Sequence, residues 1–347
     1  MLRTFGGPEV LKLEEVPTPS PPPGEVVVRV HAVTVNRSLD LKVRESGAAR
    51  GVRLPHVLGV DPTGMVAAVA NDVESVRTGD RVAVVPHIRC GSCEFCRGGR
   101  EEQCPNSRHI GVHRWGGYAE YVAAPANNVV PIPDGLGFAD AAVITRHAPT
   151  AFNLLRNLAQ IQPGEWVLVM GASGGLGAAG VQVAKLLGAT VIAGAGADAR
   201  VASALDNGAD YGVNYRTGDL ADEVARLTDR RGVDVVFENI SDPLIWPRAF
   251  ASLAHAGRLV TAGAHGGGKV ELDVRRLYGR RLRVIGGAGA SRKDVASALE
   301  AAAAGHLHAV IDRVMPLNAA ADAHRLFDSD GVVGKVVLDP TALPKVA

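Results

Sequence analysis

The chain has no excess of either charge, no long apolar run and no residue pattern typical of a secretory signal at its start. Basic and acidic residues nearly cancel, at 37 and 36 in 347 residues. A dedicated binder of nucleic acid or of a membrane surface would need a basic excess. No apolar run approaches the roughly 18 residues of a membrane span, and the start lacks the basic-then-apolar layout of a signal. We therefore expect a cytoplasmic protein whose partner is a small molecule, not nucleic acid or a membrane.

Aromatic residues are also scarce, at 4% of a chain that is 47% apolar. Alanine and small aliphatic side chains must therefore fill the cores. Glycine is abundant, at 41 residues, which is typical of a fold with many turns and close backbone approaches. The length predicts two domains or one large one.

The pattern of apolar runs changes along the chain. Short runs rich in β-branched residues fill the first third, at residues 26–30, 65–69 and 81–85, and predict an all-β, barrel-like domain. From about residue 147, apolar runs alternate with helical patterns, which predicts a parallel sheet with crossover helices. The strand runs are 166–170, 234–237 and 258–261, and the helical patterns are 176–188 and 201–207. Residues 334–338 return to strand character, and we expect them to rejoin the first domain.

A glycine-rich run, GASGGLG at 171–177, lies between a predicted strand and a predicted helix. In that context the backbone N–H groups of such a turn can approach a pyrophosphate, and the helix directs its positive end at the anion. Ala172 departs from the motif, because it holds the first glycine position. An ordinary glycine-rich turn is the alternative. The residues predicted to contact a dinucleotide here are Ser173, Gly174, Gly175 and Leu176.

The end of the second strand distinguishes NADPH from NADH. An acid at this tip would bind the ribose 2′-hydroxyl of NADH, but none stands near Ala195 or Gly196. Arg200 follows on the first helical turn, where it can pair with a 2′-phosphate. The sequence therefore favours NADPH over NADH. Arg200 could instead be a solvated helix residue, and Asp198 could still reach a 2′-hydroxyl.

The chain's four cysteines all lie in one short segment, as Cys90, Cys93, Cys96 and Cys104. A secreted disulfide scaffold would spread its cysteines, whereas four thiolates on a turn-rich loop can surround one tetrahedral zinc. Four sulfur ligands leave no open position, so we predict a structural zinc. The alternatives are an iron–sulfur cluster, for which the last gap is too long, and four free thiols.

In this order, the glycine-rich turn and the cysteine cluster resemble the zinc-containing alcohol dehydrogenase and quinone oxidoreductase group of the medium-chain dehydrogenase/reductase superfamily. The stretches FGGPEVL (5–11), PHVLGVD (55–61), GGYAEYV (116–122) and GKVVL (334–338) agree. The resemblance covers nearly the whole chain. It implies an α/β protein with two domains, whose cleft holds nicotinamide and substrate, and it implies a homodimer or homotetramer.

The resemblance also implies domain boundaries and further cofactor contacts. A GroES-like β-barrel catalytic domain would comprise residues 1–146 and 287–347, with a zinc lobe at 90–104. A Rossmann domain with a doubly wound parallel sheet would comprise 147–286. Tyr215 matches a tyrosine near the 2′-phosphate in NADPH-dependent members, although a packed core aromatic is as good an interpretation. Gly263 and Ala264 match the strand end under the nicotinamide ribose.

The resemblance makes the absence of a second metal site the main departure. Zinc alcohol dehydrogenases hold a catalytic zinc with cysteine, histidine and cysteine, and these positions carry Asn36, Val60 and Arg146 here. The neighbouring acid remains as Asp61. Valine cannot ligate zinc, asparagine is a poor ligand, and arginine would repel the metal. We therefore predict that the catalytic zinc is absent.

Without this Lewis acid, alcohol oxidation becomes harder, whereas reduction of an activated C=C bond stays feasible. The predicted enzyme is an NADPH-dependent reductase of enones, quinones or enoyl thioesters. Asn36 and Arg146 are candidate donors to the enolate oxygen, and Ser38 matches a proton-relaying hydroxyl. Each could be structural, since Arg146 can pair with Asp61 and Asn36 can brace a turn. The alternatives are an alcohol dehydrogenase or carbonyl reductase, and a non-catalytic NADPH-binding scaffold or sensor.

Overall fold

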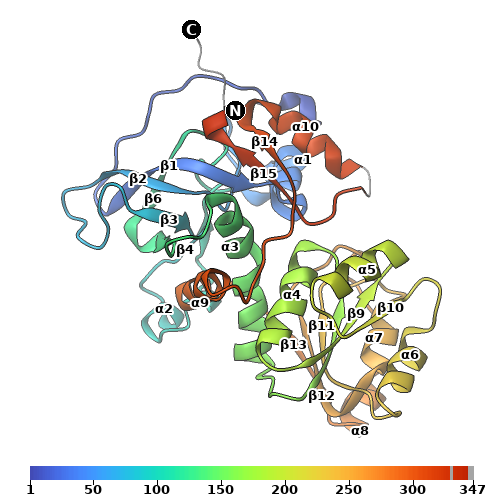
Figure 1. Cartoon of the computed structure of the whole chain (residues 1–347). Helices are drawn as coiled ribbons and strands as arrows, with labels where there is room; N and C mark the ends of the chain where they lie inside the picture. The colour runs from blue at the N-terminus through green and yellow to red at the C-terminus, as the bar shows by residue number, and fades with distance from the viewer. Residues whose placement is uncertain (329–330, 343–347) are drawn as a thin grey trace. The chain divides into compact units, whose positions relative to one another are not determined.

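The structure is a computed structural model, and it describes residues 1–328 and 331–342. It divides into two compact units, which are Met1–Arg146 with Ser291–Ala347 and His147–Ala290. Figure 1 traces both units along the chain. In residues 1–328 and 331–342, no helix has both the length and the apolar character of a membrane span.

The second unit continues further along the chain than the sequence analysis placed it. The predicted return to the first domain was residue 287, whereas the structure places it at Ser291. The reason is hydrogen bonding: Gly287 N donates to Thr261 O at 2.9 Å, and Asn153 Nδ2 donates to Gly289 O at 3.2 Å. Residues 329–330 and 343–347 of the predicted first domain lie outside the described residues.

The first unit is built on a seven-stranded sheet of order β14-β15-β1-β2-β3-β7, in which β6 also pairs with β1. Its strands are β1 (Glu25–Thr34), β2 (Thr63–Val69), β3 (Arg81–Val84), β6 (Tyr121–Pro125), β7 (Val129–Pro131), β14 (Ile311–Pro316) and β15 (Lys335–Asp339). Because β15 pairs with β1 in the register Thr34↔Val337, the late strand lies beside the first one. The prediction that residues 334–338 rejoin the first domain is therefore confirmed.

Short helices and a small hairpin complete the first unit. The hairpin consists of β4 (His87–Ile88) and β5 (Arg108–His109), and the α-helices are α1 (Lys42–Ser46), α2 (Glu94–Arg97), α9 (Arg292–Ala303) and α10 (Ala320–Arg325). The 3₁₀ and π turns are η1 (Pro8–Val10), η2 (Arg37–Leu41), η3 (Gly47–Arg50), η4 (Glu101–Gln103), η5 (Ala126–Asn128), η7 (Leu317–Ala319), η8 (Leu326–Asp328) and η9 (Pro340–Ala342). Helix α9 begins where it does because Ser291 and Asp294 form a reciprocal capping box.

The second unit is a six-stranded parallel sheet of order β10-β9-β8-β11-β12-β13. Its strands are β8 (Trp166–Met170), β9 (Thr190–Ala195), β10 (Tyr211–Asn214), β11 (Val233–Glu238), β12 (Leu253–Thr261) and β13 (Arg283–Gly286). The chain runs outward from β8 to β10, then starts again on the other side of β8 with β11. This order reverses between β8 and β11, and in such sheets ligands bind beyond the carboxyl ends of the strands at that point.

Helices connect these parallel strands. They are α4 (Gly175–Leu186), α5 (Asp198–Asp206), α6 (Leu220–Leu227), α7 (Trp246–Ala251) and α8 (Val274–Gly279); α3 (Phe138–Phe152) crosses the unit boundary and leads into η6 (Asn153–Leu158). The predicted alternation of strands and helices is confirmed. Helix α5 begins three residues before the predicted 201, because Arg200 N and Val201 N both donate to Ala197 O.

The cores confirm the role of small aliphatic side chains. In the largest buried cluster, which belongs to the first unit, valine predominates, and Tyr118 is the one aromatic member among the described residues. The second unit has its own cluster, which is mostly aliphatic and includes Leu168, Ile192 and Val236 beside the aromatic Trp246 and Phe250. Each unit therefore has an independent core, as a domain requires.

Candidate functional site

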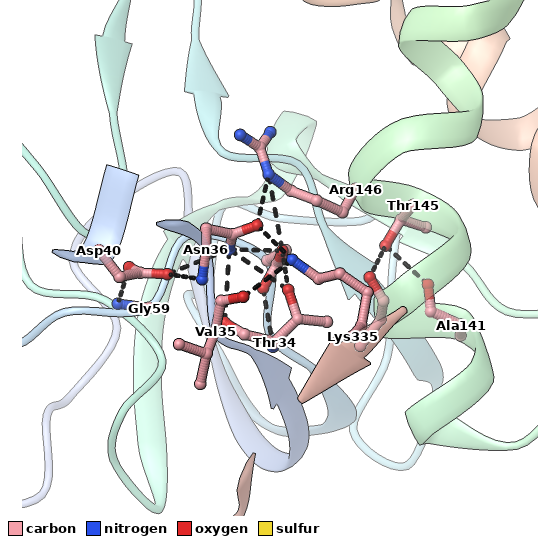
Figure 2. A network of polar contacts seen from close by, with 11 residues as sticks. Thr34, Val35, Asn36, Asp40, Gly59, Ala141, Thr145, Arg146 and Lys335 are labelled. Carbon is pink, nitrogen blue, oxygen red and sulfur yellow. Dashed lines mark hydrogen bonds and ion pairs between the residues drawn. The ribbon is translucent and has the colours of Figure 1, made fainter. Parts of the chain in front are cut away.

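A buried polar network lies where β1 and β15 meet in the first unit (Figure 2). Asn36 follows β1 and is 2% exposed, Asp61 is 1% exposed, and Lys335, the first residue of β15, is 5% exposed. Arg146 enters from α3 with 15% of its side chain exposed. Buried charges are expensive unless they are paired, so each member of this network depends on the others.

The Asn36 amide is at the centre of the network. Its Oδ1 accepts from Lys335 Nζ at 2.7 Å and from Arg146 Nε at 3.0 Å. Its Nδ2 donates to Asp61 Oδ2 and to Asp40 Oδ2, each at 3.1 Å. The amide therefore places its oxygen toward two cations and its nitrogen toward two acids, which fixes its orientation.

The two acids are held by further donors. Asp61 accepts from Thr34 N at 2.9 Å and from Thr34 Oγ1 at 2.6 Å. Asp40 accepts from Asn36 N at 2.9 Å and from Gly59 N at 3.1 Å. Burial and the nearby charge of Asp61 raise the pKa of Asp40 to about 6. Burial likewise lowers the pKa of Lys335 to about 8, against the attraction of Asp61.

The structure brings Asn36 and Arg146 together and leaves Ser38 apart. Both structural alternatives raised from the sequence are present, since Arg146 Nε lies 3.9 Å from Asp61 Oδ2 and Asn36 braces the turn that carries Asp40. Ser38 is exposed on η2. Val60 is fully buried. The catalytic roles of Asn36, Ser38 and Arg146 stay predictions.

Sequence reasoning missed Lys335, Asp40 and Thr34. A signal for Lys335 existed, because it is the one charge in the apolar run 332–338, and a lone cation inside a buried strand needs a partner. Asp40 and Thr34 gave no comparable signal, since polar residues beside a turn are common.

The guanidinium of Arg146 is only partly used by the network: Figure 2 shows its two terminal nitrogens directed away from Asn36 and Lys335.

The four cysteines of the zinc lobe converge in the first unit. Their Sγ atoms all lie within 4.8 Å of one another, with Cys90 to Cys104 at 3.5 Å and Cys90 to Cys96 at 3.9 Å. Four sulfurs around a tetrahedral zinc would be about 3.8 Å apart, given a Zn–S bond of about 2.3 Å. The backbone N–H groups of Ser92 and Cys93 lower the pKa of the Cys90 thiol to about 5, which favours the thiolate that binds metal. The donor set fits a structural zinc.

The glycine-rich turn follows β8 in the second unit, as predicted. Gly171 has φ +61°, and a Cβ on Gly177 would lie 2.1 Å from Gly171 O, so the start of α4 can pack against the turn only with glycine at that position. A Cβ on Gly174 would meet one atom, at 3.4 Å, so the backbone here is open to a ligand. Ala172 is fully buried and its N donates to Gly194 O at 3.1 Å, so alanine suits the first glycine position.

Tyr215 and two arginines gather at the end of β9. A Cβ on Gly196 would lie 3.1 Å from Tyr215 Oη and 3.2 Å from Arg216 Nε. Burial raises the pKa of Tyr215, while the charges of Arg216 and Arg200 act to lower it. Sequence reasoning named Arg200 and Tyr215 but missed Arg216, although it directly follows Tyr215.

The acid that could have bound a 2′-hydroxyl has another partner. Asp198 Oδ1 accepts from Asn214 Nδ2 at 2.7 Å, which ties the start of α5 to the end of β10. At the end of β9, the cationic side chains of Arg200 and Arg216 are therefore nearby, whereas the carboxylate of Asp198 is hydrogen-bonded to Asn214. The donor set fits a ribose that carries a phosphate.

The ends of β11 and β12 are tied to each other. Glu238 is 1% exposed; its Oε1 accepts from Ile240 N and Ser241 N at 2.8 and 2.9 Å. Ser241 Oγ donates to Gly263 O at 2.7 Å. A Cβ on Gly263 would lie 2.0 Å from Asn239 O, so glycine is required there. Gly263 and the exposed Ala264 thus lie at the same edge of the sheet as the glycine-rich turn.

Comparisons with known proteins agree with this architecture. Residues 22–134 match the family described as Alcohol dehydrogenase GroES-like domain, and residues 175–304 match Zinc-binding dehydrogenase. The NAD-dependent alcohol dehydrogenase of Sulfolobus acidocaldarius is 32% identical over 98% of this chain and 99% of its own. The quinone oxidoreductase of Homo sapiens is 30% identical over 96% and 95%.

Solved structures give the same picture. A crystal structure of an NAD-dependent alcohol dehydrogenase is 39% identical, with a TM-score of 0.90 over 97% of this chain and 98% of that one. A crystal structure of AibC is 34% identical, with a TM-score of 0.93 over 97% and 94%. These likenesses confirm the predicted α/β fold, with its GroES-like and Rossmann domains.

Proposed function

Because the chain belongs to the zinc-binding alcohol dehydrogenase and quinone oxidoreductase family of medium-chain dehydrogenases/reductases, we propose that this oxidoreductase uses NADPH to reduce activated C=C bonds without a catalytic zinc. The substrates would be enones, quinones or enoyl thioesters. One observation carries the proposal, which is that Asn36 Oδ1 already accepts from two cations, Arg146 and Lys335.

A divalent cation does not fit this network. The amide oxygen of Asn36 is the only ligand atom among the three replaced positions, and two positively charged donors already occupy it. Lys335 Nζ also donates to Val35 O at 2.9 Å, so the ammonium is fixed in place. A zinc ion here would face two positive charges in a buried setting, where their repulsion is strong. The proposed reaction therefore has no step at such a metal.

The reaction needs an electrophile for the carbonyl oxygen. When bound, the nicotinamide supplies a hydride to the β-carbon of the substrate, and the electron pair of the C=C bond moves to the carbonyl oxygen as an enolate. The terminal N–H groups of Arg146 would stabilise that oxygen, because Nε anchors the guanidinium to Asn36. Protonation of the α-carbon by water would complete the reduction.

We propose NADPH as the preferred nucleotide. The 2′-phosphate would lie at the end of β9, where Gly196 leaves room and Arg200, Tyr215 and Arg216 gather. The pyrophosphate would bind the turn that contains Ser173, Gly174, Gly175 and Leu176, at the start of α4. A structural zinc would occupy the cluster of Cys90, Cys93, Cys96 and Cys104.

Metal analysis combined with an NADPH-oxidation screen tests the proposal. We expect one zinc per chain, turnover of an enone, and little oxidation of a simple alcohol with NADP⁺. Arg146→Met should lower kcat for the enone by about 10²-fold, the cost of losing one donor to an oxyanion, with a smaller change in the Kd for NADPH. Two zinc ions per chain would contradict the proposal, as would an R146M variant with wild-type kcat.

Alcohol or carbonyl chemistry is the second candidate. It is supported by the relative named NAD-dependent alcohol dehydrogenase, which is 32% identical over 98% of this chain. In that case a ketone would be reduced faster than an enone C=C bond, and product analysis by mass spectrometry and NMR would show an alcohol. NADPH binding without oxidation of NADPH by any enone, quinone or ketone would instead indicate a scaffold or sensor.

A further inference from the structure

Two histidine side chains of the first unit face each other. His87 and His109 are paired residues of the β4–β5 hairpin, and their ring centroids are 4.1 Å apart at an interplanar angle of 69°. Their backbone atoms are engaged, since Asn128 Nδ2 donates to His87 O and His109 N donates to His113 Nδ1. In the part of the chain that the structure describes, no hydrogen bond joins either imidazole to a protein group. Both rings are half-buried and their nitrogens are not among the fully buried atoms that lack a partner, so these nitrogens are open to a ligand.

Backbone hydrogen bonds place this pair beside the polar network. Val84 N donates to Pro62 O at 2.9 Å, next to Asp61 in the chain, and Ile110 N donates to Pro86 O at 3.0 Å. A Cβ on Gly111 would lie 2.9 Å from Val60 Cγ1. The hairpin therefore borders the segment 60–62, which carries the position of a missing metal ligand.

The charges around the pair are all positive. The charge of Arg146 lowers the pKa of both rings, and the charge of Arg50 lowers the pKa of His109. Arg89 also lowers both pKa values, but it lies beside the zinc cysteines and donates to Ser107. No carboxylate is among the groups that act on His87. Burial and these cations lower the pKa of both rings, for His109 to about 4. At pH 7 each imidazole is therefore neutral and offers one N–H donor.

We infer that His87, His109 and Arg146 form a subsite for a carboxylate carried by the unsaturated substrate. Among the described residues, no protein group accepts from the two imidazole N–H donors or from the terminal nitrogens of the guanidinium. One of these terminal nitrogens would serve the carbonyl oxygen, and a carboxylate is an acceptor that would use the other donors at once. The inference rests on the proposed function and narrows its substrate class to anionic enones.

The test compares two substrates in four proteins. The substrates are a straight-chain enone that ends in a carboxylate, separated from the double bond by methylene groups, and its methyl ester. The proteins are wild type, His87→Leu, His109→Leu and the control His255→Leu, whose side chain is exposed on β12 in the other unit. The quantity compared is the ratio of kcat/KM for the acid to kcat/KM for the ester. A general loss of folding lowers kcat/KM for both substrates equally and leaves this ratio unchanged.

We expect the acid-to-ester ratio to fall by about tenfold in H87L and in H109L and to stay unchanged in H255L, because the lost hydrogen bonds involve a charged group. The fall in this ratio should come from a higher KM for the acid. A ratio that is unchanged in both hairpin variants would overturn the inference.

A binding measurement keeps the test independent of turnover. Calorimetric titration with benzoate should show weaker binding to H87L than to wild type and H255L. If no protein oxidises NADPH with either substrate, the proposed function fails, while weaker benzoate binding would still support the subsite. Equal benzoate binding by wild type and H87L would overturn it.

Discussion

Under the proposed function, individual side chains at the end of β9 would select the nucleotide. Arg216 Nε lies 3.2 Å from the place of a Cβ on Gly196, so it borders the space that a 2′-phosphate would fill. Changing Arg216 to Ala should therefore lower kcat/KM for NADPH by about tenfold, the loss of one charged hydrogen bond. The value for NADH should change little.

Arg226 provides the matched control, because it is exposed and paired with Glu223 on α6. Steady-state kinetics of R216A and R226A with both nucleotides check the expectation. An equal loss for NADPH and NADH in R216A would mean that the residue supports the fold of the site and does not select the phosphate.

The residues of the polar network show how far sequence reasoning reached. Asn36 and Arg146 could be named because they replace ligands within local motifs. Lys335 could be suspected as a lone charge in an apolar run, but its partner Asn36 could not be named, because their contact depends on the pairing of β1 with β15 and joins residues 299 positions apart. A motif carries no information about a register set by distant strands.

At the scale of elements, the middle of β12 is bonded to the loop before β8. Arg258 is 7% exposed and bonds Glu165 through both terminal nitrogens at 2.8 and 2.6 Å, and its Nε donates to Ala159 O at 2.7 Å. Arg258→Met would leave the carboxylate and three backbone carbonyls without this donor. We expect a loss of about 3–5 kcal/mol in the free energy of unfolding.

Arg231→Met is the comparison variant, since Arg231 pairs with Asp234 in the same unit but is 55% exposed. Exposed pairs contribute about 0–1 kcal/mol. Denaturant unfolding of both variants distinguishes the two cases. Similar losses in R231M and R258M would show that burial does not determine how much these ion pairs contribute to the free energy of unfolding.

The elements themselves were mostly predictable, and their ends were not. Strands β8, β11 and β12 are buried parallel strands, which read as continuous apolar runs, so the patterns at 166–170, 234–237 and 258–261 identified them. The unit boundary was missed because residues 287–290 are held by single hydrogen bonds to Thr261 and Asn153. Such contacts leave no periodic trace in the sequence.

For the molecule as a whole, we propose a homodimer formed through β13. This strand is at the edge of the six-stranded sheet, and apolar side chains near it are exposed, with Tyr278 at 71%, Val274 at 59% and Val284 at 40%. An exposed edge of this kind is suited to pairing. Light scattering should give twice the chain mass for wild type and the single mass for Val284→Glu combined with Tyr278→Glu. A monomeric wild type would contradict the proposal.

Buried neutral histidines should make the whole chain sensitive to acid. Burial lowers the pKa of His324 to about 3 and that of His109 to about 4, whereas both titrate near 6.5 when unfolded. The stabilisation that they retain above pH 6.5 is therefore lost as pH falls toward these folded-state values. Asp40 has the opposite effect on stability. Because its pKa is raised to about 6 in the folded state, the folded state binds a proton at a higher pH than the unfolded state, which stabilises the fold as pH falls.

Two histidines outweigh one aspartate, so the free energy of unfolding should fall between pH 6.5 and pH 4. Each histidine contributes at most about 1.4 kcal/mol per pH unit. Urea unfolding at several pH values checks this, and His324→Gln should have a shallower dependence than wild type. A wild-type curve that is flat or rises toward pH 4 would contradict the expectation.

The position of β15 has a consequence for biosynthesis. Strands β14 and β15 are translated after the whole second unit, yet β15 carries Lys335 into contact with Asn36 and pairs with β1. Domains tend to fold in order as they leave the ribosome. The Rossmann domain can therefore be folded before the last strands of the first domain have been synthesised. Nascent or truncated chains could therefore bind nucleotide but would lack the assembled charge network, so under the proposed function hydride transfer would require chains whose translation has passed Lys335.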